Sequence, residues 1–339
     1  MKVLITGGSG LIGRHLARGL LDEGHQPVIV SRQSDEVRRK REFRDFQVIQ
    51  GDPTAEGRWQ REVDGCDAVV CLAGHNLFAK RWNPEIKRKI RDSRVYAIEG
   101  VVAAIKKARN RPKVLVQASA IGYYGTHGDE ELDESSPSGS DFLAVVCREW
   151  EQASEDVESL GVRRAVVRVG VVLAPGEGAL AFMTPIFKLV PGAPIGSEGR
   201  LGPAKGRQWM SWIHIDDIAG IIRLAIDNSE ASGPINGTAP HPVRNAEFSK
   251  TLSSVLWKPY APWRFYIPAG PPDALLQLML GEVAIVITAG QKVLPKKAMS
   301  LGYHFKFPEL EGALRDVFKD KPKPVTTIKP EAASARAHH

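Results

Sequence analysis

Residues 6–13 read Thr-Gly-Gly-Ser-Gly-Leu-Ile-Gly, directly after a short apolar stretch (residues 3–5) and at the start of a helical apolar pattern. In such a loop Gly7 permits a tight turn, Gly10 lets the backbone approach a pyrophosphate, and Gly13 lets helix and strand pack closely. The free N–H groups of the first helical turn then face the phosphates. The pattern therefore predicts a dinucleotide-binding loop rather than an ordinary strand–helix turn, with two more contacts expected from the first turn, Leu11 and Ile12.

The rest of the first half alternates strand and helix signals, which is typical of a parallel sheet covered on both faces. Strands are expected at 2–6, 27–31, 47–50, 68–72, 113–118 and 164–169, with helices near 11–23, 84–108 and 141–159. We predict an α/β fold, a Rossmann-type doubly wound parallel sheet with a smaller C-terminal α/β lobe. The predicted Rossmann domain spans 1–173 and is completed by about 209–235, and the lobe comprises 174–208 and 236–318.

The second half is less regular. Glycine and proline punctuate 175–208, residues 209–215 are expected to form a strand, and Asp216 is expected to cap a helix that ends at Asp227. Further helices are expected at 245–257, 271–280 and 309–318. The Pro-, Lys- and Ala-rich end, 320–339, lacks apolar periodicity, so we expect it to be disordered.

Composition excludes several classes of protein. Hydrophobic residues make up 43% and charged residues 25% of the 339 residues, as in ordinary globular proteins. No apolar run approaches the roughly 18 residues of a membrane span, and the amino terminus does not resemble a secretory signal. Three cysteines suit neither a disulfide framework nor a metal site, so we expect a cytoplasmic protein without metal.

A net charge of +7 raises the question of nucleic-acid binding. The excess lies in residues 38–44 and in the tail at 319–329, and neither segment interleaves aromatic residues with its cations. A base-stacking surface needs such aromatics. We therefore expect no nucleic-acid partner, and read the first cluster as a solvated arm near an anionic cofactor.

The end of the second strand indicates which dinucleotide binds. NAD-specific sites place an acid there to bind the ribose 2′-hydroxyl, whereas this chain has Ser31 and Arg32. An arginine pairs well with a 2′-phosphate. The sequence therefore predicts NADP(H), the alternative being an exposed arginine beside a loop.

Other positions extend the predicted cofactor site. Asp52 is placed to reach the adenine or simply to form an Asp-Pro turn, and Leu72, Ala73 and Gly74 keep the backbone close to the nucleotide. Arg94 falls on the apolar stripe of the helix at 84–108, where a guanidinium needs an anion. We expect a cofactor phosphate there, with Lys89 at the edge; a structural salt bridge is the alternative.

Taken together, the motifs resemble the atypical branch of extended short-chain dehydrogenases/reductases called NAD-dependent epimerase family proteins. The resemblance covers roughly residues 1–318, and it implies an NADP(H)-binding Rossmann core followed by the family's own C-terminal module. Val172, in the RVGVVL motif, is expected at the cofactor site. The resemblance rests on TGGSGLIG (6–13), CLAGHN (71–76), SR (93–94), SAIGYYG (119–125), DFLAVVCREWE (141–151), RVGVVL (168–173), SWIHIDD (211–217) and GQKVLPKKAMSLGYHF (290–305).

The chain departs from its superfamily at the proton relay. The superfamily uses a tyrosine, a lysine four residues later, and a serine or threonine. Here the tyrosine and lysine positions hold Leu143 and Cys147, and the serine position holds Ala120. We expect Cys147 to be a core residue and His214 to be structural. As replacements for the relay we select Ser119 and Tyr123, with Arg168 or Lys188 as a neighbouring cation.

Three functions remain open on this basis. The first is an NADP(H)-dependent oxidoreductase with a small, polar substrate, with a homodimer possible. The second is a non-catalytic NADP(H) sensor or scaffold, which the missing relay motivates. The third is a sugar-nucleotide epimerase, which the family label implies and the missing relay disfavours.

Overall fold

The computed structural model describes residues 1–189, 194, 205–256, 277–278 and 281–319. Its centre is a seven-stranded sheet in the order β11-β7-β5-β4-β1-β2-β3, in which all neighbouring strands are parallel. This is the predicted doubly wound Rossmann-type sheet. Its strands are β1 (Lys2–Thr6), β2 (Gln26–Ser31), β3 (Gln47–Gln50), β4 (Ala68–Cys71), β5 (Val114–Ala120), β7 (Arg163–Val169) and β11 (Gly233–Gly237).

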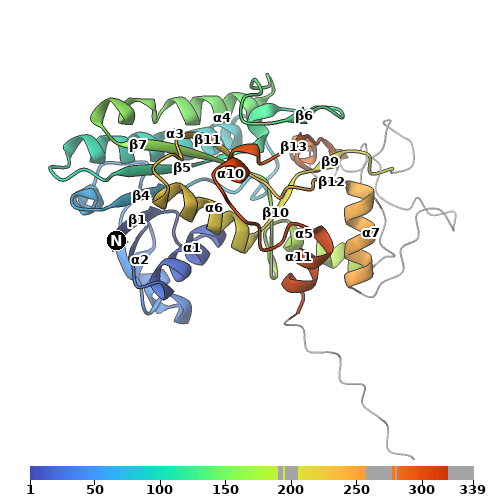
Figure 1. The fold of residues 1–339 in the computed structure, drawn as a ribbon, viewed down its shortest axis with the longest axis horizontal. Coiled ribbons are helices and arrows are strands. Elements are labelled where there is room, and N and C mark those ends of the chain that lie inside the picture. The colour runs from blue at the N-terminus through green and yellow to red at the C-terminus, as the bar shows by residue number, and fades with distance from the viewer. Residues whose placement is uncertain (190–193, 195–204, 257–276, 279–280, 320–339) are drawn as a thin grey trace, which may run out of the picture.

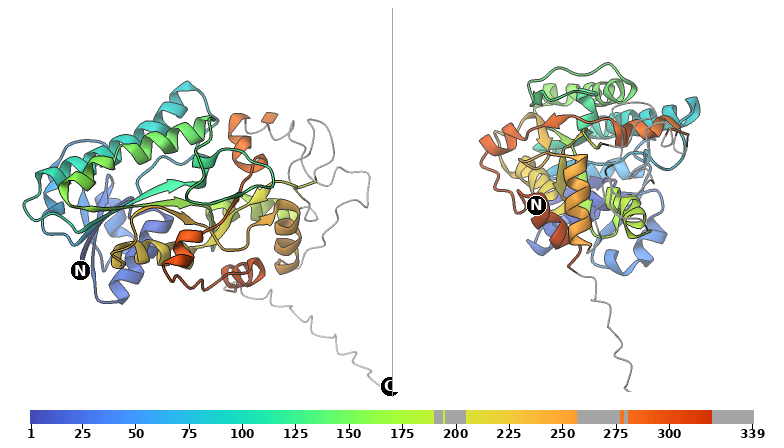
Figure 2. Two further views of the ribbon diagram at one scale, coloured as in Figure 1. Left: turned by 45° about the horizontal axis from the view of Figure 1, so that its top comes forward. Right: turned by 90° about the vertical axis from the view of Figure 1, so that its right-hand side faces the viewer.

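Helices cover both faces of this sheet, as Figures 1 and 2 show. One face packs against α1 (Leu11–Asp22), α2 (Ser34–Arg39) and α6 (Ile215–Asp227), and the other against α3 (Pro84–Lys107) and α4 (Phe142–Gln152). Local sequence determines where α3 and α4 begin. The Asn83 side chain accepts the Ile86 N–H ahead of α3, and Asp141 accepts the Ala144 N–H ahead of α4.

A smaller lobe lies at the carboxyl ends of the central strands (Figure 1). Its core is built around the buried side chains of Trp212 and Phe248. The lobe strands pair two by two: β8 (Val171–Ala174) with β10 (Trp212–His214), β9 (Trp209–Met210) with β12 (Val243–Arg244), and β6 (Glu131–Leu132) with β13 (Lys292–Val293). The helices of this part are α5 (Gly178–Leu189), α7 (Asn245–Val255), α9 (Ile285–Thr288), α10 (Lys296–Ser300) and α11 (Leu310–Val317). Short 3₁₀ turns complete the fold: η1 (Arg41–Phe43), η2 (Arg58–Val63), η3 (Ile121–Tyr124), η4 (Glu155–Leu160) and η5 (Gly281–Ala284).

Three sequence predictions about these elements were wrong in detail. The helix expected at 141–159 ends at Gln152 and continues as η4. The strand expected at 209–215 is broken at Ser211, whose hydroxyl donates to the Gln291 carbonyl and accepts the Val293 N–H. The N-cap of α6 is His214 rather than Asp216, because the His214 ring accepts the Asp216 N–H.

The segment at 175–208 is rich in glycine and proline, but part of it is regular, since residues 178–189 form the helix α5. Two other predictions fall outside the described residues: the disordered tail at 320–339 and most of the helix at 271–280. Within the described ranges, no helix has both the length and the apolar character needed to cross a bilayer. The same residues contain no cluster of metal-binding side chains.

The C-terminal module is held to the sheet by a buried carboxylate on α6. Asp217 is fully buried, and its two oxygens accept hydrogen bonds from the Tyr303 hydroxyl (3.0 Å), the Lys306 N–H (2.8 Å) and the Phe307 N–H (3.0 Å). Gly220, one turn later, leaves the room that the Tyr303 hydroxyl fills, since a Cβ there would lie 2.1 Å from that oxygen. Residues 303–307 are therefore fastened to α6 at a defined register.

We expect Asp217→Asn to lower the free energy of unfolding by about 1.5–3 kcal/mol, because an amide group would face donors that now share a charged acceptor. Proteolysis near residues 303–307 should become faster. The matched control is Asp216→Asn, since Asp216 is partly exposed and pairs with His15 (2.8 Å) and Lys306 (3.7 Å) at the surface. Chemical denaturation and limited proteolysis of both variants check this prediction. An equal loss of stability in Asp217→Asn and Asp216→Asn would contradict it.

Candidate functional site

The glycine-rich loop connects β1 to α1 in the middle of the sheet. β1 lies between β4 and β2, where the order of strands along the chain reverses, and open α/β sheets bind their ligands at such a point. Gly7 has a φ of +73°, and a Cβ on it would lie 2.6 Å from the carbonyl carbon of Leu72. A Cβ on Gly13 would lie 2.4 Å from the Gly7 carbonyl oxygen. Both glycines are therefore required by close backbone approach, with Leu72 and Ala73 forming the wall opposite Gly7.

The first turn of α1 offers its N–H groups to a ligand. Gly10 is the N-cap and, as a glycine, supplies no side-chain acceptor, while the first turn contains no acidic residue. Orphan N–H groups and the positive end of the helix dipole favour an anion. The side chain of Leu11 lies close to the first residue of α5, since a Cβ on Gly178 would be 3.3 Å from it.

Ser31 and Arg32 end β2 beside this loop, as predicted. Ser31 is buried and its hydroxyl accepts the Gln33 N–H (3.2 Å). Arg32 is exposed, and within the described part of the chain its guanidinium forms no ion pair. Asp52 follows β3 and accepts hydrogen bonds from both the N–H and the hydroxyl of Thr54, so this carboxylate stabilises a turn. Its contact with an adenine stays a prediction.

The carboxyl end of β4 lies in a positively charged environment. The pKa of His75 is lowered by burial and then by four nearby cations, Arg94, Lys89, Arg32 and Lys80. Lys89 lies on the exposed side of α3 and pairs with Glu85 (2.5 Å). Arg32, which follows β2, and the cations of α3 are therefore close enough to the end of β4 to act on His75, which favours an anionic ligand there.

A cavity of about 1500 Å³ extends from this edge of the sheet into the lobe. The predicted cofactor residues Ile12, Arg94 and Val172 line it, together with Ser119. Most of the other described wall is apolar, whereas the sequence analysis expected a small, polar substrate. The apolar wall comprises Leu77, Phe78, Trp82, Ile90, Phe142, Leu143, Val146, Trp150, Ile285 and Val286.

The two positions that should hold the relay both face this cavity. Leu143 and Cys147 lie one turn apart on α4 and line it. Burial raises the pKa of the Cys147 thiol to about 12, so the thiol is protonated at neutral pH and is not an activated nucleophile. Cys147 is 5% exposed, which confirms that it is a core residue.

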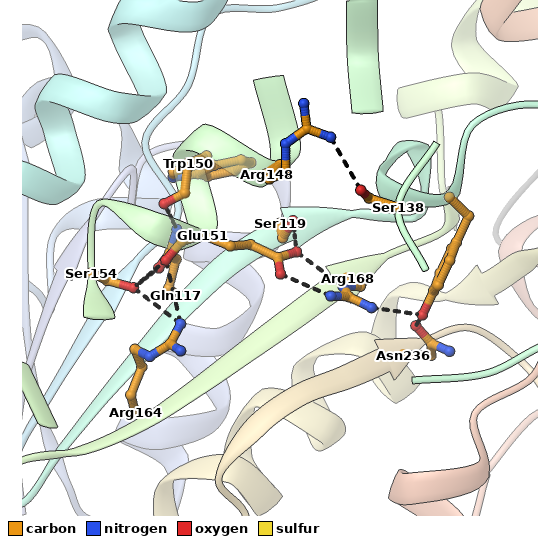
Figure 3. A network of polar contacts seen from close by, with 11 residues as sticks. Gln117, Ser119, Ser138, Arg148, Trp150, Glu151, Ser154, Arg164, Arg168 and Asn236 are labelled. Carbon is orange, nitrogen blue, oxygen red and sulfur yellow. Dashed lines mark hydrogen bonds and ion pairs between the residues drawn. The ribbon is translucent and has the colours of Figure 1, made fainter. Parts of the chain in front are cut away.

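Ser119 belongs to a buried polar network that crosses the sheet (Figure 3). Its hydroxyl donates to Glu151 (2.6 Å), and Glu151 also accepts two hydrogen bonds from Arg168, each 2.9 Å. Arg168 donates in addition to the Tyr124 hydroxyl (3.0 Å), which donates to Asn236 (2.7 Å). The network therefore ties β5, α4, β7, η3 and β11 together, and it occupies the Ser119 hydroxyl.

Neither tyrosine of η3 is positioned as a proton donor by the described contacts. The Tyr123 ring stacks on the Arg168 guanidinium, with 3.4 Å between the guanidinium carbon and the ring centre, and it is not among the described residues that line the cavity. Burial raises the pKa of Tyr124 to about 12 although Arg168 acts in the opposite direction. Arg168 lies beside both tyrosine rings, but its guanidinium is already paired with Glu151. The side chain of Lys188, the other cation considered, lies outside the described residues.

His214 is a structural residue, as the sequence indicated. It is 2% exposed, caps α6, and packs against the Phe307 ring with 4.0 Å between ring centres. Burial lowers its pKa. It is therefore part of the junction between α6 and the C-terminal module.

Sequence reasoning missed two important side chains. Glu151 entered the sequence analysis only as the last residue of the motif at 141–151, although it is the acceptor at the centre of the network. Trp150 entered only as part of the same motif, although it lines the cavity and lies beside Arg94, whose guanidinium carbon is 5.4 Å from the ring centre. The spacing of Trp150 three residues after Cys147 was the available signal, because it places both on one helical face.

Family comparisons agree with this geometry. Residues 3–236 match the model of the NAD dependent epimerase/dehydratase family, and residues 271–317 match a domain of unknown function, DUF1731. The first match covers the sheet and its helices, and the second covers the C-terminal module predicted from the sequence.

Individual relatives match over nearly the whole chain. The chloroplastic SDR39U1 homolog of Arabidopsis thaliana, an epimerase family protein, is 42% identical over 94% of this chain and 87% of its own length. The epimerase family protein YfhF of Bacillus subtilis is 36% identical over 95% of this chain and 99% of its own. The crystal structure of human SDR39U1 (isoform 2) with NADPH has a TM-score of 0.80 and 34% identity, covering 95% of this chain and 100% of that one.

Proposed function

Because the chain belongs to the NAD dependent epimerase/dehydratase family, we propose that it binds NADP(H) and acts as an oxidoreductase on a small substrate. The observation that carries the proposal is the continuity between the glycine-rich loop and the cavity. Ile12 and Val172, beside that loop, line the same cavity as Ser119 and Leu143, at the relay position. A cofactor on the loop would therefore extend into a chamber that has room for a second molecule.

The residues present fit this cofactor. The uncapped first turn of α1 and the glycines at 7 and 13 suit a pyrophosphate. Arg32, which has no ion pair among the described residues, suits a 2′-phosphate. The NADPH of the human relative's structure agrees with the preference predicted from Arg32. Site residues Gly10, Leu11, Ser31, Asp52, Gly74 and Lys89 are proposed as further contacts.

The bound nicotinamide would supply or accept a hydride. What this chain contributes is a largely apolar chamber, which excludes water, and cations along one side of it. The Ser119 hydroxyl holds its proton toward Glu151, so it cannot pass that proton to a substrate without breaking the 2.6 Å bond. The tyrosine of the usual relay is replaced by Leu143, so the proton must come from another group or from water.

The proposal is tested with the full chain loaded with NADPH and offered a panel of aldehydes, ketones and 2-oxo acids. Loss of the reduced-nicotinamide absorbance, with formation of one alcohol per cofactor, is the expected result. A panel that leaves the bound NADPH reduced throughout, while the protein still binds it, would refute the oxidoreductase assignment.

We expect Arg32→Ala to weaken NADPH binding about tenfold or more and to leave NADH binding nearly unchanged, because charge-assisted hydrogen bonds are worth roughly 1.5–3 kcal/mol. The matched control is Arg109→Ala. Arg109 is also exposed, but it lies between α3 and β5, at the amino ends of the strands, so it should leave both affinities unchanged. Calorimetric titration of the wild type, Arg32→Ala and Arg109→Ala measures the effect. An equal loss of affinity for NADPH and NADH in Arg32→Ala would contradict the 2′-phosphate role.

A second candidate function is a non-catalytic NADP(H) sensor or scaffold. It is favoured by the apolar side chain at Leu143 and the neutral thiol at Cys147, where the superfamily carries its relay. Sugar-nucleotide epimerisation is disfavoured by the same two residues, because it needs that relay. A sensor predicts different hydrogen exchange in the C-terminal module with NADP⁺ and with NADPH. Identical exchange in the two states would eliminate sensing.

A further inference from the structure

One part of the cavity wall is an apolar pocket that the proposed cofactor contacts do not line. It contains Trp82, whose ring makes an edge-to-face contact with Phe142, with 5.3 Å between ring centres. Such aromatic pairs are stabilising beyond the area that they bury. The side chains of this apolar pocket come from the loop before α3, from α3 itself, from the first turn of α4 and from α9: Leu77, Trp82, Ile90, Phe142, Leu143 and Val286.

The position of Leu143 places the apolar pocket on the substrate side of the cavity. In the superfamily this position holds the relay tyrosine, which passes a proton to or from a substrate oxygen. Leu143 lies against η3, after the carboxyl end of β5, since a Cβ on Gly122 would be 3.4 Å from the Leu143 Cβ. The glycine-rich loop instead lies against the end of β4, at Leu72 and Ala73. The pocket is therefore where a substrate is expected, rather than the cofactor's phosphates.

The C-terminal module supplies one side of the apolar pocket. η5 and α9 belong to the segment that matches the domain of unknown function, and Val286 of α9 contributes its side chain. Glu282 of η5 forms an ion pair with Lys87 of α3, and the Lys87 ammonium lies 5.1 Å from the ring centre of Phe142. These contacts hold the module against the starts of α3 and α4. The pocket is therefore complete only with the module in place.

The charges of the described cavity wall offer no partner to an anion at the apolar pocket. That wall contains three carboxylates and one cation, Arg94. Arg94 has no ion pair within the described part of the chain, and it lies against Gly74 among the cations near His75, so it stays with the proposed cofactor site. Burying a charge without a partner is costly, so the pocket favours an uncharged group. Each carboxylate already has its own contact: Asp141 with the Ala144 N–H, Glu177 with Arg14, and Glu282 with Lys87.

We propose that the apolar pocket holds the body of the substrate, so that the substrate is an uncharged aldehyde or ketone with an aromatic or alicyclic group. Its carbonyl carbon would gain the hydride that NADPH loses on becoming NADP⁺, and its oxygen would take up one proton from solvent. The assignment rests on the proposed oxidoreductase function and specifies its substrate class. It replaces the small, polar substrate expected from the sequence.

The test measures binding of product alcohols to the full chain saturated with NADPH, because an alcohol cannot be reduced further and turnover is avoided. One pair of probes is cyclohexylmethanol and its tetrahydropyran analogue, in which a ring oxygen replaces the opposite CH₂ group. The other pair is para-isopropylbenzyl alcohol and para-hydroxymethylbenzoate. Calorimetry should show the apolar member of each pair binding about tenfold or more tightly than the polar member, since the pocket gives a buried polar group no partner.

Phe142→Ala should remove most of that preference, because it deletes one ring of the aromatic pair. Val286→Ala, a smaller deletion on the module side, should lower the affinity for the apolar alcohols by a smaller factor. The matched control is Phe305→Ala. Phe305 is also half-buried and makes an edge-to-face contact, 5.0 Å between ring centres, with Tyr303, but it packs against the core of the sheet, outside the described cavity wall. It should keep the full preference.

All the proteins are first titrated with NADPH. A loss of NADPH affinity of about tenfold in Phe142→Ala would overturn the assignment, because the pocket would then belong to the cofactor. Equal binding of both members of a pair by the wild type, or tighter binding of the polar member, would also overturn it and leave the oxidoreductase proposal intact. A wild-type protein that binds no NADPH would refute the proposed function itself, and with it this assignment.

Discussion

Glu151→Leu is expected to lower the free energy of unfolding by about 3–5 kcal/mol, the usual cost of leaving a buried charge without its partner. Arg168 is 3% exposed and Glu151 9% exposed. Burial disfavours the charge on Arg168, but the hydrogen bonds and charge of Glu151 outweigh it, so the pKa of Arg168 is raised. Without Glu151, the contacts left to that charge among the described residues are the Tyr124 hydroxyl and the rings of Tyr123 and Tyr124.

Two further variants identify the cause of that loss. Glu158→Gln removes a surface partner of Arg164 (3.2 Å) and should cost less than about 1 kcal/mol. The double variant Glu151→Leu with Arg168→Met removes both buried charges and should regain much of the loss. Urea denaturation of the four proteins measures these values. A double variant as unstable as Glu151→Leu alone would contradict the pairing argument.

Gly7→Ala is expected to weaken NADPH binding more than tenfold and to destabilise the fold. The new Cβ would lie 2.6 Å from the Leu72 carbonyl carbon and 2.7 Å from the Ala73 nitrogen, so the loop must move away from β4. The same substitution also forces alanine to a φ of +73°, at a cost of about 1–2 kcal/mol.

Gly24→Ala separates these two effects. Gly24 has a φ of +79° and no atom within 4 Å of its would-be Cβ, so it carries the backbone strain without the clash. It should lose a similar 1–2 kcal/mol and retain NADPH affinity. Thermal denaturation measures the stability of Gly7→Ala and Gly24→Ala, and calorimetric titration measures their affinity for NADPH. An unchanged NADPH affinity in Gly7→Ala would show that the loop does not contact the cofactor.

The sheet and the phosphate loop could be predicted because local sequence determines them. The strand at 2–6, the glycine spacing and the start of the helix at residue 84 each depend on neighbouring residues, and the structure reproduces all three. Boundaries were less predictable where tertiary contacts decide. Ser211 interrupts the predicted strand because its hydroxyl bonds to Gln291 and Val293, 80 residues or more away.

The candidate site was predictable only in part, for the same reason. Arg32 and the glycines follow from a motif, but the hydrogen bond that Ser119 donates to Glu151 joins residues from β5 and α4. The apolar wall combines Trp82 with Val286, which are far apart in the sequence. Sequence spacing can place a residue on a helical face, but it cannot say which distant side chain meets it there.

The central claim is that the loop at 6–13, together with Arg32, binds NADP(H) in preference to NAD(H). Calorimetric titration of NADPH and NADH into one preparation of the full chain tests it most directly. The account predicts one NADPH bound per chain, with a Kd at least tenfold below that of NADH. No heat with NADPH, or equal affinity for the two cofactors, would contradict it.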